Sequence, residues 1–304
     1  DREAVSVVGA EAVTHRVETV RHLHVSEEQR STSVLVRDFD FTRPRADVQG
    51  RSEVSGADER PVYEFASDAV LANYSNPVYG AENTEAQARR RLEALRATAR
   101  SARGRSNVTG MLPGAKFALQ HHEHDDLNRE LLVVSAEHWG HAPEATAQET
   151  QQAPEAGASS QRTSKDEDRY HNELVCIASD VTYRPPRNFV RPTIAGIQTA
   201  TVVGPAGEEI HTDEHGRIKV QFHWDREGQR NERSSCWVRV VQGTWAGTGW
   251  GSVTIPRISM EAVVSFVEGN PDRPVVTGTL FNGANRPPYD LPAERAKNTF
   301  RTSS

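Results

Sequence analysis

The sequence predicts a mainly β protein with one helix, on three observations. Short runs that alternate apolar and polar residues recur along most of the chain, and Gly, Pro, Asn and Asp fill the gaps between them. A helical apolar period is sustained only once, over residues 84–103. Hydrophobic residues make up only 36% of the 304 residues. We therefore expect lean β-domains, or subunits that complete their burial by assembling.

The domain organisation follows from length and from shifts in composition. At ~150 residues per domain, the chain is long enough for about two domains. Runs such as SVLVRDFDF and RPVYEF are typical of strands in the first part, and a stretch poor in branched and aromatic residues interrupts the chain near its middle. The expected order is a β-barrel region with one helix (1–141), a flexible Ala/Gln/Glu-rich loop or linker (142–169), an extended connector (170–192), an OB-fold-like small β-barrel (193–285) and a short terminal segment (286–304).

The predicted helix begins with a possible capping box, Thr84 with Gln87. Gly104 is the expected stop. Residues 82–105 contain seven arginines and three glutamates, a formal charge of +4. Two interpretations of this basic face stay open: a solvated face, or a contact with an acidic partner surface. The apolar stripe is too thin for insertion at a membrane surface.

The strongest strand pattern lies in residues 194–283, where six short runs follow one another without a helix. This number and spacing predict an OB-type barrel. We expect the segment Gly216–Val241 to form a hairpin with a charged tip, DREGQRNER, that stays in water and blocks edge-to-edge pairing. One strand face of this hairpin carries Ile218, Val220, Phe222 and Trp224, and the other carries Lys219, Gln221 and His223.

The charge and the cysteines exclude several classes of protein. The net charge of −6 does not favour a nucleic-acid binder, whose domain is usually basic. No run of 18 apolar residues predicts a membrane-spanning helix. The chain opens on Asp1 without a signal-peptide pattern, as expected of a piece of a longer protein. Its two cysteines, Cys176 and Cys236, do not make a disulfide framework, and Cys236 is expected to be a small buried residue.

Two stretches rich in histidine and acidic residues are candidates for metal sites. In HHEHDD, residues 121–126, the weak candidates for metal ligands are His122, His124 and Asp126. Their spacing matches no known metal-binding motif. We therefore favour a polar turn between two strands. In IHTDEHGR, Asp213 and Gly216 are expected to flank a turn. No GxSxG elbow or paired-carboxylate site stands out, so we expect neither an enzyme nor a cofactor.

The Gly-rich stretch GTWAGTGWG, residues 243–251, lacks the spacing and the lysine of a phosphate loop. Trp245 and Trp250 beside glycines are expected to pack against protein, because glycine permits close approach. Stacking on a base or a sugar is the alternative. An OB-type barrel that binds single-stranded nucleic acid would use a basic groove with stacking aromatics, and Trp224 and Trp237 could serve that role.

The second half of the chain resembles a known family. The stretch from Ile194 to Pro292, including GRIKVQFHWDREGQRNERSSCWVRVV and FVEGNPDRPVVTGTLFNG, is similar to VgrG, the spike protein of type VI secretion systems. VRDFDFTRP, ARRRLEALR, PGAKFALQHH and EHWG resemble the hub region of that family, which is related to contractile phage tails. The matching positions are architectural in the family. Ser259 and Met260 depart from its pattern, which usually has Gly-Gln there.

The resemblance implies a non-enzymatic, puncturing and delivering scaffold. It implies a homotrimer that sits on a ring of the secreted tube protein, with a needle beyond residues 286–304, a tip protein of the proline-alanine-alanine-arginine (PAAR) repeat type, and effectors carried on the spike. It implies synthesis in the cytoplasm, assembly on the secretion apparatus, and secretion or injection that crosses the target membrane only transiently. It implies no nucleic-acid partner.

The expected structural and interface residues are six, all in the second half: Trp224, Arg226, Trp237, Arg239, Trp245 and Trp250. Trp245 and Trp250 are the candidates for contacts around a threefold axis. Two other functions stay open from the residues alone: an OB-fold single-stranded nucleic-acid binder, and a metallohydrolase centred on the His cluster.

Overall fold

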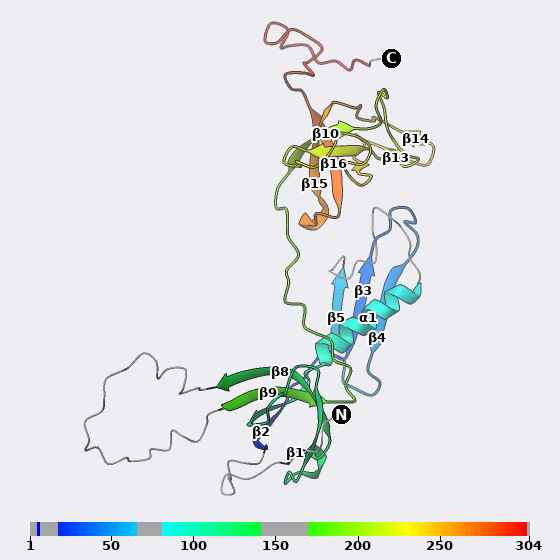
Figure 1. Ribbon diagram of the computed structural model, residues 1–304. Coiled ribbons are helices and arrows are strands. Elements are labelled where there is room, and N and C mark those ends of the chain that lie inside the picture. Colours follow the sequence, from blue (N-terminus) through cyan, green and yellow to red (C-terminus); the bar gives the residue numbers. More distant parts are fainter. Residues whose placement is uncertain (1–4, 7–17, 66–80, 141–169, 303–304) are drawn as a thin grey trace, which may run out of the picture. The chain divides into compact units, whose positions relative to one another are not determined.

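The computed structural model describes residues 5–6, 18–65, 81–140 and 170–302 (Figure 1). It divides into two compact units. The first comprises residues 1–37, 49–65 and 81–187, and the second comprises residues 38–48, 66–80 and 188–304. Strands are the commonest regular structure of the described residues, which include one α-helix, as predicted. The predicted linker at 142–169 lies outside the described residues.

The main sheet of the first unit has six strands in the order β1-β7-β8-β9-β6-β2. Its longest pair is antiparallel, with Val133 opposite Cys176 and Trp139 opposite His171. Within the described residues, only β1 pairs in parallel in this sheet. The strands are β1 (Val5–Ser6), β2 (Val20–Glu27), β6 (Arg100–Ser106), β7 (Lys116–Gln120), β8 (Glu130–Gly140) and β9 (Tyr170–Ala178).

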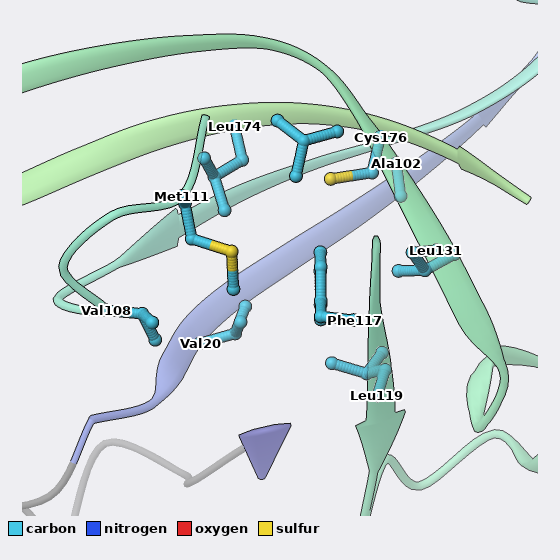
Figure 2. Packing of buried hydrophobic residues seen from close by; sticks show 10 residues of the cluster. Val20, Ala102, Val108, Met111, Phe117, Leu119, Leu131, Leu174 and Cys176 are labelled. Atoms are coloured by element: carbon cyan, nitrogen blue, oxygen red, sulfur yellow. The ribbon is translucent and has the colours of Figure 1, made fainter. Parts of the chain in front are cut away.

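Alternate side chains of these strands form the core of the first unit (Figure 2). Met111 and Phe117 lie among the strands' inward residues, and both are almost completely buried. Burial raises the pKa of the Cys176 thiol to about 12, so this cysteine acts as a small apolar residue. The buried members of the cluster are Val20, Ala102, Val108, Met111, Phe117, Leu119, Leu131, Val133, Leu174 and Cys176.

Helix α1 (Ala81–Arg96) packs on a second, three-stranded sheet of the order β4-β3-β5 (Figure 1). The strands are β3 (Ser33–Asp38), β4 (Val48–Glu53) and β5 (Pro61–Phe65), and β5 runs parallel to β3. The contact depends on Gly50, because a Cβ there would overlap the carbonyl of Thr84 and lie 2.7 Å from the nitrogen of Glu85. Glycine therefore lets the helix backbone touch the strand.

The helix differs from its predicted bounds at both ends. It begins at Ala81, so Thr84 is an interior residue, buried against β4 rather than an N-cap. It ends at Arg96, and residues 100–106 form β6 instead of a further helical turn. Along β6 the buried residues Ala102, Gly104 and Ser106 alternate with arginines. This period of two fits a strand, and pairing with β2 and β9 on its two sides outweighs the helix propensity.

The predicted connector also starts later than expected. Residues 170–178 form β9, which is paired with both β6 and β8, so they belong to the first unit. In this part of the chain, contacts assign the residues up to Arg187 to that unit and those from Asn188 onward, like the earlier segment 38–48, to the second. Within the described residues no helix is long and apolar enough to cross a membrane.

The second unit contains a five-stranded sheet of the order β11-β10-β15-β16-β12. The two outer strands meet through one bridge, in which Ile218 and Val238 exchange backbone hydrogen bonds of 2.9 and 2.8 Å. The sheet therefore curls into a barrel whose two outer strands meet at this bridge. The strands are β10 (Gln198–Val203), β11 (Lys219–Phe222), β12 (Arg239–Val240), β15 (Glu261–Phe266) and β16 (Pro274–Leu280).

Of the four residues predicted to share one strand face, Ile218 and Val220 lie in the core of this barrel, whereas Trp224 is exposed. Ile218 and Val220 are fully buried together with Val202, Val238 and Val264. The predicted hairpin is looser than expected, because β11 and β12 share that single bridge and pair mainly with β10 and β16 respectively. Barrel closure, not a local turn, therefore sets the separation of the two strands.

Candidate interaction surface

Trp245 and Trp250 lie on a small hairpin that leaves both rings in water. Strands β13 (Ala246–Gly247) and β14 (Trp250–Gly251) pair in antiparallel register. The indole of Trp250 lies over Gly247, where a Cβ would be 2.7 Å from ring atom Cζ2. The exposed fractions are 61% for Trp245 and 66% for Trp250. The glycines thus give the hairpin its close ring-to-backbone contact, and a large apolar area remains available to a partner.

Trp224 is a second exposed aromatic residue on the barrel. Its Nε1–H donates a hydrogen bond of 2.9 Å to Oε1 of Gln198. Its ring stacks on Phe222 at 5.3 Å between centroids, and 65% of the residue is exposed. The hydrogen bond and the stack hold the indole in one orientation, so its outer face is preorganised for contact.

Trp237 and Arg239 are instead engaged inside the second unit. His211 stacks on Trp237 at 4.9 Å, and the Nζ of Lys219 lies 4.8 Å from the centre of the Trp237 ring. The guanidinium of Arg239 lies 4.7 Å over the ring of Phe41. Both side chains therefore contribute cation–π contacts within the unit. Arg226 is exposed in the charged loop.

Phe41 belongs to a loop, residues 38–48, that the sequence did not associate with the barrel. Contacts place this loop in the second unit. The guanidinium carbon of Arg217 lies 5.4 Å from the centre of the Phe41 ring, in addition to that of Arg239. The rings of Phe41 and His215 pack in a T-shaped arrangement with 5.6 Å between their centres. Phe41 thus contacts two guanidinium groups and an imidazole, and these contacts anchor the loop to the barrel.

The same loop begins with a buried ion pair. Nη2 of Arg273 lies 2.6 Å from Oδ2 of Asp38, and 5% and 0% of the two side chains are exposed. The backbone N–H of Phe39 also donates to Asp38, at 2.8 Å. Asp38 lies in the stretch VRDFDFTRP, and Arg273 lies in the stretch GNPDRP, 235 residues further along the chain. No local pattern pairs two residues so far apart, so sequence reasoning missed this contact.

The stretch IHTDEHGR forms the predicted turn. Gly216 adopts a φ of 67°, the left-handed region that favours glycine, and its N–H donates to the carbonyl of Asp213 at 3.0 Å. Nε of Arg217 donates to Asp213 Oδ2 at 2.6 Å. Burial raises the pKa of Asp213, but hydrogen bonds and charge from Arg217 together lower it more, so the net pKa lies below the ordinary value. Asp213 therefore stabilises a turn and pairs with arginine.

The weak metal candidates are engaged with protein groups. The N–H of His124 donates to Nδ1 of His122 at 3.0 Å, and their rings stack at 5.7 Å. Asp126 binds Arg100, and this hydrogen bond, assisted by the arginine charge, holds the pKa of Asp126 below its ordinary value. In the described part of the chain, no three His, Cys, Asp or Glu side chains are placed to hold a metal ion.

Gln221 has a structural role that the predicted strand pattern did not reveal. It is only 7% exposed, because it holds the charged loop from inside. Its Oε1 accepts from the N–H of Arg230 at 2.6 Å and from the hydroxyl of Ser234 at 2.9 Å. Its Nε2 donates to the carbonyl of Gly228 at 3.0 Å. One buried amide therefore fixes a loop whose charged side chains extend into water.

We expect Gln221→Met to destabilise the second unit by about 1–3 kcal/mol, because it leaves buried loop groups without partners. Amide hydrogen exchange should rise over residues 225–234, measured by mass spectrometry. The matched control is Gln229→Met, an exposed glutamine of the same loop, which should leave exchange unchanged. Equal exchange in wild type and Gln221→Met would contradict the assigned role.

The comparisons with known proteins agree with this architecture. Residues 1–144 match the family described as "Phage tail baseplate hub (GPD)", and residues 199–281 match the "Type VI secretion system/phage-baseplate injector OB domain". The first match covers the chain from β1 to β8, including α1, and the second falls on the closed barrel.

Two curated relatives come from Pseudomonas aeruginosa. The type VI secretion system spike protein VgrG1b is 40% identical over 92% of this chain and 35% of its own length. VgrG1a is 41% identical over 92% of this chain and 40% of its own length. This chain thus spans well under half of either relative. Among solved structures, this chain is similar to the E. coli c3393 protein, which is described as a type VI secretion component with structural similarity to T4 tail proteins gp27 and gp5. The match covers 92% of this chain and 50% of the c3393 chain, with a TM-score of 0.46 and 16% sequence identity.

The fold and these matches define a class, a phage-type tail-hub segment followed by an injector OB barrel. The chain belongs to the VgrG spike family of type VI secretion systems.

Proposed function

We propose that this chain is the hub and OB part of a type VI secretion spike, which transmits force instead of catalysing a reaction. The observation that carries the proposal is the exposed Trp245–Trp250 hairpin on an injector-type OB barrel. Large exposed apolar patches mark interfaces between proteins. The relatives are spike proteins by name.

The proposed assembly is a homotrimer in which Trp245 and Trp250 lie at the contacts around the threefold axis. Threefold closure gives each barrel two neighbours and leaves no open direction of growth. It also adds buried surface that the lean cores of a chain with 36% hydrophobic residues cannot supply by themselves. Trp224 extends the same kind of surface on the barrel.

The wider proposal follows the family. The trimer sits on a ring of the secreted tube protein, a needle beyond residues 286–304 carries a PAAR-type tip protein and effectors, and the particle is made in the cytoplasm, assembled on the apparatus and injected. In this proposal the target membrane is crossed only during puncture. The nucleic-acid and metallohydrolase alternatives gain no support from the comparisons, which match spike and tail-hub proteins.

The oligomer tests the proposal directly. Light scattering of the purified chain is expected to give a mass near three times 33.7 kDa. Trp245→Ala combined with Trp250→Ala should shift the mass toward the single chain and lower the melting temperature. The matched control, Trp139→Ala, removes an indole of the first unit that is 40% exposed and should leave the mass unchanged. An unchanged mass and melting temperature in the double variant would refute the assigned interface.

A further inference from the structure

The described part of the first unit contains an apolar cavity of about 480 Å³. Its lining comes from α1 and from the strands next to it, and Leu92, Ala97, Leu131 and Ile177 are nearly fully buried. This volume lies in the range of roughly 300–1,000 Å³ that small-molecule sites occupy, and such sites combine apolar walls with a few polar groups. None of the spike roles proposed above uses this cavity.

The charged side chains that line the cavity are mostly arginines. Four arginines and two acids contribute, a formal excess of two positive charges. A cavity with apolar walls and a positive rim suits a ligand with an apolar body and a negative head. The six charged lining residues are Arg89, Glu93, Arg96, Arg100, Arg129 and Asp180.

Both acids of the lining are already neutralised. Asp180 binds Arg129 at 2.8 Å, and Glu93 binds Arg184 at 2.8 Å. They therefore oppose an incoming anion only weakly. Arg100 in turn is engaged by two acids, Glu27 at 2.9 Å and Asp126, so its charge is largely compensated.

Arg96 is in a different position. It is the basic residue of the last turn of α1 and is partly buried. Within the described residues, the hydrogen bond that the structure gives its side chain runs from Nη1 to the carbonyl of Ser31, at 3.2 Å. A carbonyl is neutral, and a guanidinium carries five N–H donors. Arg96 thus brings an uncompensated charge and spare donors to the cavity rim.

We propose that this cavity binds a single-chain amphipathic anion, a medium-chain fatty carboxylate, with its hydrocarbon tail against Leu92, Leu131 and Ile177 and its carboxylate on Arg96. Guanidinium and carboxylate match in a bidentate, charge-assisted geometry. Each methylene buried in an apolar environment strengthens binding by about fourfold. The proposal does not depend on trimer formation or on the spike role.

Isothermal titration calorimetry with decanoate tests the site, at low ionic strength and below the concentration at which decanoate forms micelles. One equivalent should bind per chain, and the affinity should rise about fourfold per methylene from hexanoate to decanoate. Arg96→Gln should weaken decanoate by about tenfold or more and leave the neutral analogue decanol unchanged. Decanol binding also shows that the variant is folded. Arg90→Gln, an exposed arginine of the same helix outside the lining, is the matched control and should bind as wild type.

A second variant tests the apolar part. Ala99→Leu adds volume at the lining and should weaken decanoate and decanol together. The proposal is overturned if wild type does not bind decanoate, if Arg96→Gln binds it as tightly as wild type does, or if hexanoate and decanoate bind equally. The chain-length series needs no variant, so it decides the question even where a substitution impairs folding.

Discussion

Replacing Arg273 with methionine is expected to lower the free energy of unfolding of the second unit by about 3–5 kcal/mol. The reason is the carboxylate left behind. Asp38 has a fully buried side chain and loses the guanidinium 2.6 Å away. Breaking a buried ion pair by removing one partner costs more than the net contribution of the intact pair. Urea unfolding followed by tryptophan fluorescence reports mainly on this unit, because four of the five tryptophans lie in it.

Two variants separate this effect from a general loss of charge. Asp38→Leu together with Arg273→Met should recover most of the stability, since an apolar pair of similar volume replaces both charges. Arg233→Met removes an exposed arginine of the same unit, 3.9 Å from Glu232 and 88% exposed, and should cost no more than about 1 kcal/mol. Similar losses in Arg273→Met and Arg233→Met would show that the Asp38–Arg273 contact has no special weight.

Replacing Gly50 with alanine is the second large expected effect. The new Cβ would overlap the carbonyl of Thr84 and lie 2.7 Å from the nitrogen of Glu85. These are helix backbone atoms, so relief requires α1 or β4 to move, and overpacking of this kind typically costs about 1–3 kcal/mol. Gly50→Val should cost more, because it adds two further methyl groups at the same contact.

Circular dichroism at 222 nm follows this change, because α1 supplies the α-helical signal of the described residues. The first thermal transition of that signal should shift to lower temperature in Gly50→Ala. Gly140→Ala is the control: it lies in the same unit, and a Cβ there meets nothing within 4 Å. Coincident melting of Gly50→Ala and wild type would contradict the tight helix–strand contact.

The strand predictions held where the alternation of residues was local and strong. Ser33–Asp38 and Pro61–Phe65 are strands in the structure, as expected from the runs SVLVRDFDF and RPVYEF. Ile218 and Val220, which were predicted to share one strand face, are both buried. The prediction for residues 100–103 was wrong, because the helical pattern continued to Arg103 while pairing with β2 and β9 stabilises a strand there.

The candidate interaction surface was predictable only in part. The sequence identified Trp224, Trp245 and Trp250, and all three are exposed. It also proposed Trp237 and Arg239, which the structure engages with His211, Lys219 and Phe41. Exposure depends on which groups surround a side chain in the folded protein. The alternation of residues along a strand shows only which side chains lie on the same face of that strand.

The sequence by itself determined the mainly β class and the small barrel, because apolar alternation and turn residues act between near neighbours along the chain. The family came from the resemblance of the stretch 194–292 to VgrG. The tertiary structure alone decided the end of α1, the buried role of Gln221, the Asp38–Arg273 pair and the cavity beside Arg96. Each of these depends on the path that brings distant segments together. Burial and pairing free energies arise only after that path has formed.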